Sequence, residues 1–170
     1  LAQELRLISY ASTATVSVAY RREDISHPLD GFGFVAPAAE GRKIIACTFS
    51  SVKYSGRAPN GHVLLRAFVG GALQPDLLEK DDAALETNVR QELGALLGIK
   101  GAPLFCRIFR HPLSMPQYKV GHLELVRRIE DALERLPALR LAGSAYGGAG
   151  IADCVRSGEA AAEKLLAGLG

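Results

Sequence analysis

A glycine-rich stretch near the C-terminus constrains the fold of this chain more than any other feature. Residues 139–142 form a short apolar run, Gly147, Gly148 and Gly150 follow, and a helical pattern runs from about residue 152. This order predicts a buried strand, a tight turn and a helix. Glycines before a helix N-terminus let a ligand approach free backbone N–H groups, which favours an anion or cofactor site. On composition alone, a turn without a ligand is an equally good interpretation.

The turn departs from the usual dinucleotide-binding fingerprint. Asp153 stands where the third glycine of the G-x-G-x-x-G pattern belongs. The acidic residue expected about 20 positions later has no place before Gly170. We therefore interpret the turn as one side of a cofactor site and the chain as part of a larger protein. The start at Leu1, without a start-like segment, favours the same interpretation.

The chain predicts a mixed α+β fold. Helical spacing of apolar residues predicts one helix over 82–97, capped by Asp81 or Asp82 and stopped by Gly98, and a second over 121–136. The first half is expected to be mainly antiparallel sheet. Strands are expected at 11–20, 34–36, 43–48, 62–69, 103–110 and 139–142, with the fifth ending at His111-Pro112.

Composition excludes few function classes but argues against some. The 170 residues carry a net charge of +2 and no basic block, which gives little support to nucleic-acid binding. Cys47, Cys106 and Cys154 are widely spaced, which favours reduced thiols and a cytoplasmic protein. No apolar run approaches the roughly 20 residues that span a bilayer, and peripheral membrane contact is left open.

No set of residues suggests acid–base or metal chemistry. His27, His62, His111 and His122 are scattered, and we expect surface or satisfied core histidines rather than metal ligands. Ser157 is expected on a solvated helix face. We assign no catalytic residue and no metal, so a reaction here requires a cofactor that carries the chemistry.

Four stretches together resemble one known family. Residues 141–162, Leu-Ala-Gly-Ser-Ala-Tyr-Gly-Gly-Ala-Gly-Ile-Ala-Asp-Cys-Val-Arg-Ser-Gly-Glu-Ala-Ala-Ala, resemble the C-terminal flavin motif of the oxygen-dependent protoporphyrinogen oxidase family, in the flavin-containing amine oxidase superfamily. Residues 31–37, 64–71 and 115–122 resemble further signatures of that family, in the family's order.

The resemblance implies a fragment of a two-domain flavin oxidase. Residues 10–119 are similar to part of the substrate-binding domain, with its antiparallel sheet. Residues 120–170 are similar to the C-terminal strand and helix of the Rossmann-like FAD-binding domain. Residues 1–9 would form a connecting segment. In the family, the first FAD-binding βαβ unit lies far upstream, so the missing N-terminal part is an implied partner.

The resemblance also implies site residues. Ala149, Gly150 and Ile151, with Gly148, match backbone that contacts FAD. His111 stands where the family commonly has a tryptophan near the flavin. Phe68 matches a position that faces the tetrapyrrole pocket.

The implied reaction is oxidation of protoporphyrinogen IX to protoporphyrin IX by molecular oxygen in haem synthesis, with coproporphyrinogen as a close variant. We expect this chain alone to bind FAD weakly, to be inactive, and to self-associate through apolar surfaces. Two alternatives are open: a non-catalytic binding or assembly module, and a different flavin amine oxidase that acts on amines or polyenes.

Overall fold

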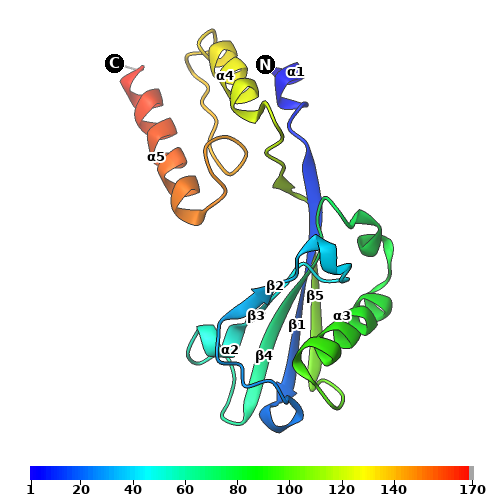
Figure 1. Cartoon of the computed structure of the whole chain (residues 1–170). Coiled ribbons are helices and arrows are strands. Elements are labelled where there is room, and N and C mark those ends of the chain that lie inside the picture. Colours follow the sequence, from blue (N-terminus) through cyan, green and yellow to red (C-terminus); the bar gives the residue numbers. More distant parts are fainter. Residues whose placement is uncertain (169–170) are drawn as a thin grey trace. The chain divides into compact units, whose positions relative to one another are not determined.

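The computed structural model describes residues 1–168, and the chain divides into two compact units. Unit 1 comprises Leu1–Tyr10 and Pro116–Gly170, and unit 2 comprises Ala11–Met115. Figure 1 shows the elements of each unit in sequence colours. The chain passes from unit 1 to unit 2 and back again, so the two ends of the sequence contribute to the same unit.

Unit 2 is built on a five-stranded sheet with strand order β2-β3-β4-β1-β5. β2 and β3, β3 and β4, and β4 and β1 pair antiparallel. The expected antiparallel sheet is therefore confirmed, and β-branched and aromatic residues account for its longer strands. The strands are β1 (Tyr10–Arg21), β2 (Gly33–Val35), β3 (Ala46–Phe49), β4 (His62–Gly70) and β5 (Phe105–Pro116).

One face of this sheet is covered by helix α3 (Asp82–Leu97) (Figure 1). The side chain of Asp81 accepts a hydrogen bond from the N–H of Ala84 at 2.8 Å, and Gly98 ends the helix in the left-handed conformation. Both predicted ends of this helix are confirmed. Alternate strand residues pack against α3 in one core, which includes Val16, Val18, Leu65, Ala67, Leu85, Val89 and Leu93.

The opposite face of the sheet carries the other alternate residues. Phe68 lies opposite Thr15 of β1 and Ala46 of β3, and it is half-buried. Short helices complete unit 2: α2 (Ser50–Lys53) and three 3₁₀ turns at Arg22–Asp24, Ala38–Glu40 and Pro75–Glu79.

Unit 1 contains three helices in its described part: α1 (Ala2–Leu5), α4 (His122–Leu133) and α5 (Ile151–Ala167). α1 packs against α4, so residues 1–9, expected as a connection, include a helix of this unit. A small core gathers around α4, whereas α5 buries none of its residues. The core consists of Ile8, Leu125, Ile129, Leu133 and Ala145.

Two sequence predictions about elements are wrong. Residues 139–142 form no strand, because no strand of the described chain pairs with them and an isolated strand leaves its backbone groups unpaired. β5 does not end at His111-Pro112 but continues to Pro116. It lies at the edge of the sheet, where a proline removes no hydrogen bond that the sheet needs.

The helices within residues 1–168 are all too short or too polar for one of them to cross a bilayer.

Candidate cofactor-binding site

The glycine turn before α5 admits no side chain at its centre. Gly148 has a φ of 146°, a conformation that favours glycine. A Cβ placed on Gly148 would also lie 2.7 Å from the carboxylate of Asp153. The turn is therefore specified both by backbone conformation and by the close approach of Asp153 from the first turn of the helix.

No side chain caps the start of α5. Gly150 is the N-cap and provides no side chain to bond the first N–H groups. Ala149 and Gly150 are exposed, and Ile151 is 87% exposed. The predicted contact residues 148–151 thus form one short segment at the positive end of a 17-residue helix.

This segment fits a cofactor whose polar ring edge meets backbone N–H groups. The one acidic side chain of the first turn, Asp153, pairs with Arg156, so the positive helix end is not opposed by an unpaired carboxylate. The exposed backbone and the glycine that excludes a side chain match what close approach of a flavin carbonyl requires.

Tyr118 holds the turn in place, a role that the sequence did not suggest. Its hydroxyl accepts a hydrogen bond from the N–H of Gly148 at 3.1 Å and donates one to the carbonyl of Ser144. The ring stacks on His122 with centroids 4.2 Å apart. The available signal was that Tyr118 lies inside the Met115–His122 signature, which the sequence had already singled out.

Ser157 ties the loop before the turn to α5. Its Oγ accepts a hydrogen bond from the N–H of Gly143 at 3.0 Å, and the residue is half-buried. The expectation of a solvated face is therefore wrong for Ser157. The serine lies on the side of α5 that faces the loop. The sequence could not show this, because the contact depends on the conformation of the loop.

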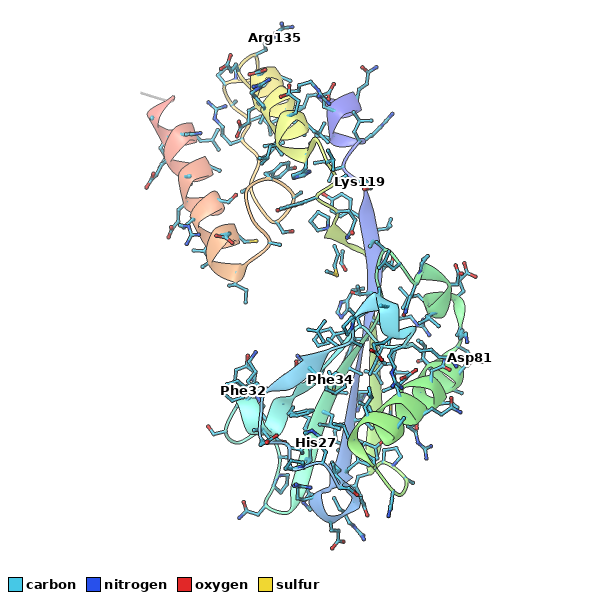
Figure 2. All side chains as sticks on the ribbon, viewed as in Figure 1. His27, Phe32, Phe34, Asp81, Lys119 and Arg135 are labelled. Carbon is cyan, nitrogen blue, oxygen red and sulfur yellow. The ribbon has the colours of Figure 1, made fainter. Side chains whose placement is uncertain are left out.

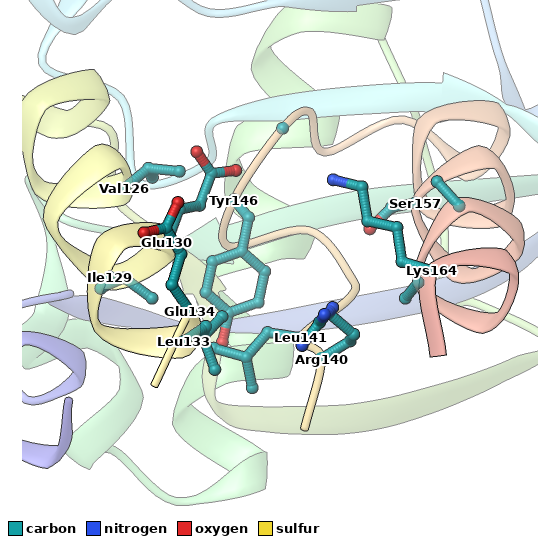
Figure 3. Close-up of a pocket in the computed structure, with 13 residues that line it drawn as sticks. Val126, Ile129, Glu130, Leu133, Glu134, Arg140, Leu141, Tyr146, Ser157 and Lys164 are labelled. Carbon is teal, nitrogen blue, oxygen red and sulfur yellow. The ribbon is translucent and has the colours of Figure 1, made fainter. Parts of the chain in front are cut away.

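A cavity of about 470 Å³ lies between α4, the loop and α5 within unit 1. Figure 3 shows Leu141 and Tyr146 of the loop between the two helices, with Glu130 on α4 and Lys164 on α5. Burial, and secondarily the nearby Tyr10, raises the pKa of Tyr146 above its ordinary value. The cavity wall thus combines apolar side chains such as Ile129 and Leu141 with charged ones such as Glu130 and Lys164.

The remaining predicted site residues, Phe68 and His111, belong to unit 2. Nε2 of His111 lies 3.4 Å from Oγ1 of Thr15, and Thr15 is the cross-strand neighbour of Phe68. The structure therefore gathers Phe68 and His111 around Thr15, on the face of the sheet away from α3. Arg110, next in sequence to His111, turns the other way and binds Asp82 of α3 at 2.7 Å.

The histidines differ in their surroundings. His27 accepts a hydrogen bond from the N–H of Leu29 at 2.9 Å, and His62 bonds the carbonyl of Asn60 at 3.0 Å. The ring of His27, labelled in Figure 2, packs edge-on against Phe49 with centroids 5.8 Å apart. His122 is only 7% exposed, yet its Nε2 has no partner, so the expectation of a satisfied histidine is wrong there.

Two of the three free cysteines are held as protonated thiols. Burial raises the pKa of Cys47 to about 12. Burial, and then the charge of Glu86, raises the pKa of Cys106 to about 11. Since the thiolate is the reactive form, neither thiol is suited to nucleophilic or redox chemistry at neutral pH.

Comparison with known protein families shows which family the chain belongs to. Residues 1–166 match the family described as flavin containing amine oxidoreductase. The chain belongs to this family. Its glycine turn and all of α5 except Ala167 lie inside the matched residues.

Relatives of this chain carry porphyrinogen oxidase names. The coproporphyrinogen III oxidase of Staphylococcus aureus is 37% identical over 93% of this chain and 34% of its own length. The mitochondrial protoporphyrinogen oxidase of Nicotiana tabacum is 30% identical over 94% of this chain and 32% of its own length. The chain thus spans about a third of the length of these relatives.

Solved structures agree with the family assignment. A crystal structure from Exiguobacterium sp. 255-15, provisionally assigned as a protoporphyrinogen oxidase, is similar with a TM-score of 0.80 and 33% identity. The match covers 98% of this chain and 36% of that one, so this chain corresponds to a part of a larger fold. The mixed α+β fold and its fragment character are both confirmed.

Proposed function

We propose that this chain is the C-terminal part of an FAD-dependent porphyrinogen oxidase that uses molecular oxygen. The observation that carries the proposal is the bare start of α5 at a turn where Gly148 excludes a side chain, in a chain whose relatives are named as porphyrinogen oxidases. A flavin oxidase needs no acid–base set, which agrees with the lack of one in the sequence.

Each unit is assigned a task. Unit 1, with residues 120–170, is the returning segment of the FAD-binding domain. Unit 2, within residues 10–119, is part of the substrate-binding domain. The support is that the flavin-motif residues 148–151 fall in unit 1, whereas Phe68 and His111 fall in unit 2.

The turn would hold the flavin ring by its backbone. The N–H groups at the start of α5 would donate to a flavin carbonyl, with Gly148 and Ala149–Ile151 in contact. When bound, FAD supplies the redox chemistry by accepting electron pairs from the substrate. The positive end of α5 stabilises negative charge beside it, which favours the reduced cofactor. Tyr118 acts as a positioning residue, because it fixes the N–H of Gly148.

The open face of the unit 2 sheet would bind the macrocycle. Phe68 offers an aromatic surface, and His111 beside Thr15 replaces the family's tryptophan with a smaller ring that still stacks or hydrogen-bonds. Conversion of a porphyrinogen to a porphyrin removes six hydrogens in three two-electron steps, and three molecules of oxygen would accept them as hydrogen peroxide.

Coproporphyrinogen III is a second candidate substrate beside protoporphyrinogen IX. Bacterial coproporphyrinogen III oxidases from Staphylococcus aureus and Bacillus subtilis are 37% and 31% identical to the chain. The protoporphyrinogen oxidases of Bos taurus and Arabidopsis thaliana are 30% and 27% identical. The protoporphyrinogen oxidase of Macaca fascicularis is 32% identical, so the identities of the two groups overlap and both porphyrinogens are kept as candidate substrates of the longer protein.

The N-terminal part of the same protein is the proposed partner of unit 1. The sequence of residues 139–142 predicts a strand, but these residues pair with no described strand. Their backbone groups would complete a sheet with strands from the missing part. The cavity between α4 and α5 would then be filled by side chains of that sheet.

Flavin binding and turnover test the proposal. The purified 170-residue chain is expected to be colourless, and titration with FAD is expected to quench flavin fluorescence only weakly. The longer protein, purified with FAD, is expected to convert coproporphyrinogen III or protoporphyrinogen IX in air, measured by porphyrin fluorescence. A rate no higher than the spontaneous oxidation, with FAD bound at full occupancy, would overturn the assignment.

The same measurements separate the alternatives. A non-catalytic module would leave the longer protein colourless, and an oxidase for amines would reduce its flavin with an amine but not with a porphyrinogen. Self-association is proposed for the isolated chain, because Ile151, Val155 and Leu166 of α5 are more than half exposed. Light scattering is expected to show a dimer or larger species, and a monodisperse monomer would contradict this.

A further inference from the structure

A second cavity of unit 1 lies at the start of α4, apart from the glycine turn. Its volume is about 340 Å³, and its lining includes Ser9, Lys119, His122, Glu124 and Arg128. Figure 2 shows Lys119 on the segment that leads into α4. Nothing in the proposed oxidase chemistry uses these residues.

Two residues that line this cavity, Ser9 and His122, each carry a buried polar atom without a hydrogen-bond partner. Nε2 of His122 is unpartnered in a side chain that is only 7% exposed, and the hydroxyl of Ser9 is likewise buried and unpartnered. A buried polar group without a hydrogen bond costs about 1–3 kcal/mol. Two such groups that line the same cavity therefore indicate a polar guest.

The charges around the cavity favour an anion. Gly121, the N-cap of α4, has no side chain to bond the first N–H groups of this 12-residue helix. The acids nearby are matched: Glu4 pairs with Arg128 at 2.9 Å and Glu124 with Arg127 at 2.7 Å. Lys119 takes part in none of the ion pairs found within residues 1–168, so its positive charge is not neutralised by a carboxylate there.

We propose that this cavity binds a small oxyanion, a phosphate or a carboxylate group. The Ser9 hydroxyl, the His122 imidazole N–H at Nε2 and the Lys119 ammonium would donate to its oxygens, and the start of α4 would add its positive end. These groups are donors or positive charges, as an anion site requires, and the carboxylate residue of the lining, Glu124, is paired with Arg127.

Histidine ring NMR of the 170-residue chain tests the site. Inorganic phosphate is titrated at constant pH and at an ionic strength held constant with sodium chloride, and acetate is titrated in a second series. A saturable shift of the His122 ring signals, with no matching shift of His27 or His62, is expected in at least one series. Saturation by phosphate alone or by acetate alone identifies which oxyanion fits.

Matched variants locate the binding groups. Lys119→Gln and Ser9→Ala are each expected to weaken the affinity roughly fivefold, the effect of losing one charge or one hydrogen bond. Lys100→Gln, which alters an exposed lysine of unit 2, is expected to leave it unchanged. The amide spectrum of each variant checks that the fold is kept. Shifts that stay linear with both anions, or equal affinities in all three variants, would overturn the proposal.

Discussion

The two units differ sharply in how much of their own apolar surface they bury. Unit 2 closes its sheet with α3 over a continuous core in which Leu65, Leu85 and Leu93 are fully buried. Unit 1 has a small cluster around α4, and α5 buries no residue. Buried apolar area drives folding, so we expect unit 2 to contribute more of the folding free energy than unit 1, whose helix α5 leaves its apolar side chains uncovered.

The largest expected effect is a core truncation in unit 2. Leu93→Ala removes a fully buried side chain and leaves a cavity, so we expect a loss of about 2–5 kcal/mol in the free energy of unfolding. Urea denaturation measures it. Leu166→Ala on α5, where the side chain is 70% exposed, is the control and is expected to cost less than about 0.5 kcal/mol. Equal losses would break the contrast between the units.

Gly148→Ala is expected to destabilise the turn of unit 1 by about 1–3 kcal/mol, because the residue would adopt a strained φ and meet Asp153. Amide hydrogen exchange around Ala149–Ile151 is expected to accelerate, while exchange in β4 stays as in the wild type. Gly158→Ala, a mid-helix glycine of α5 with open space around it, is the control and is expected to slow exchange in α5. Unchanged exchange at the turn in Gly148→Ala would contradict our account of it.

The stability of unit 2 is expected to fall at alkaline pH through Cys47. Burial raises the pKa of this thiol in the folded chain to about 12, from an ordinary value of 9.0. The contribution is therefore complete below pH 9 and is lost as pH rises from 9 toward 12. The slope is about 1.4 kcal/mol per pH unit for one such group.

Urea denaturation at pH 8, 9 and 10 measures this slope. Cys47→Ala is expected to be less stable at pH 8 but to lose less stability between pH 9 and 10. Cys154→Ala, in unit 1, keeps the buried thiol and is expected to retain the wild-type slope. Parallel curves for wild type and Cys47→Ala would disprove the linkage.

Tyr118→Phe is the smallest expected change, about 1 kcal/mol, because it removes only the hydroxyl that bonds Gly148 and Ser144. The ring and its stacking on His122 are kept. Faster amide exchange at Gly148, with no change in the urea midpoint of unit 2, is the expected result. Tyr54→Phe, whose half-exposed ring lies beneath Lys53 in unit 2, serves as the control.

Sequence reasoning succeeded where a local pattern was enough. Helix α3 was predicted with both ends, because Asp81 bonds its own helix start and Gly98 takes the left-handed conformation at its end. It failed for residues 139–142, where an apolar run predicts a strand but a strand needs a neighbour to pair with. The contacts of Ser157 and Tyr118 were also missed, since they join residues 14 and 30 positions from their partners.

By itself the sequence determined the family, the antiparallel sheet and the segment 148–151 as a bare helix start. These follow from residue types and spacing that act over a few positions, and from motifs that are read directly. Only the tertiary structure decided that Tyr118 fixes the turn, that Phe68 and His111 share Thr15 on one sheet face, and that His122 is buried without a partner. Burial and hydrogen bonding depend on which distant segments meet, and no local pattern contains that information.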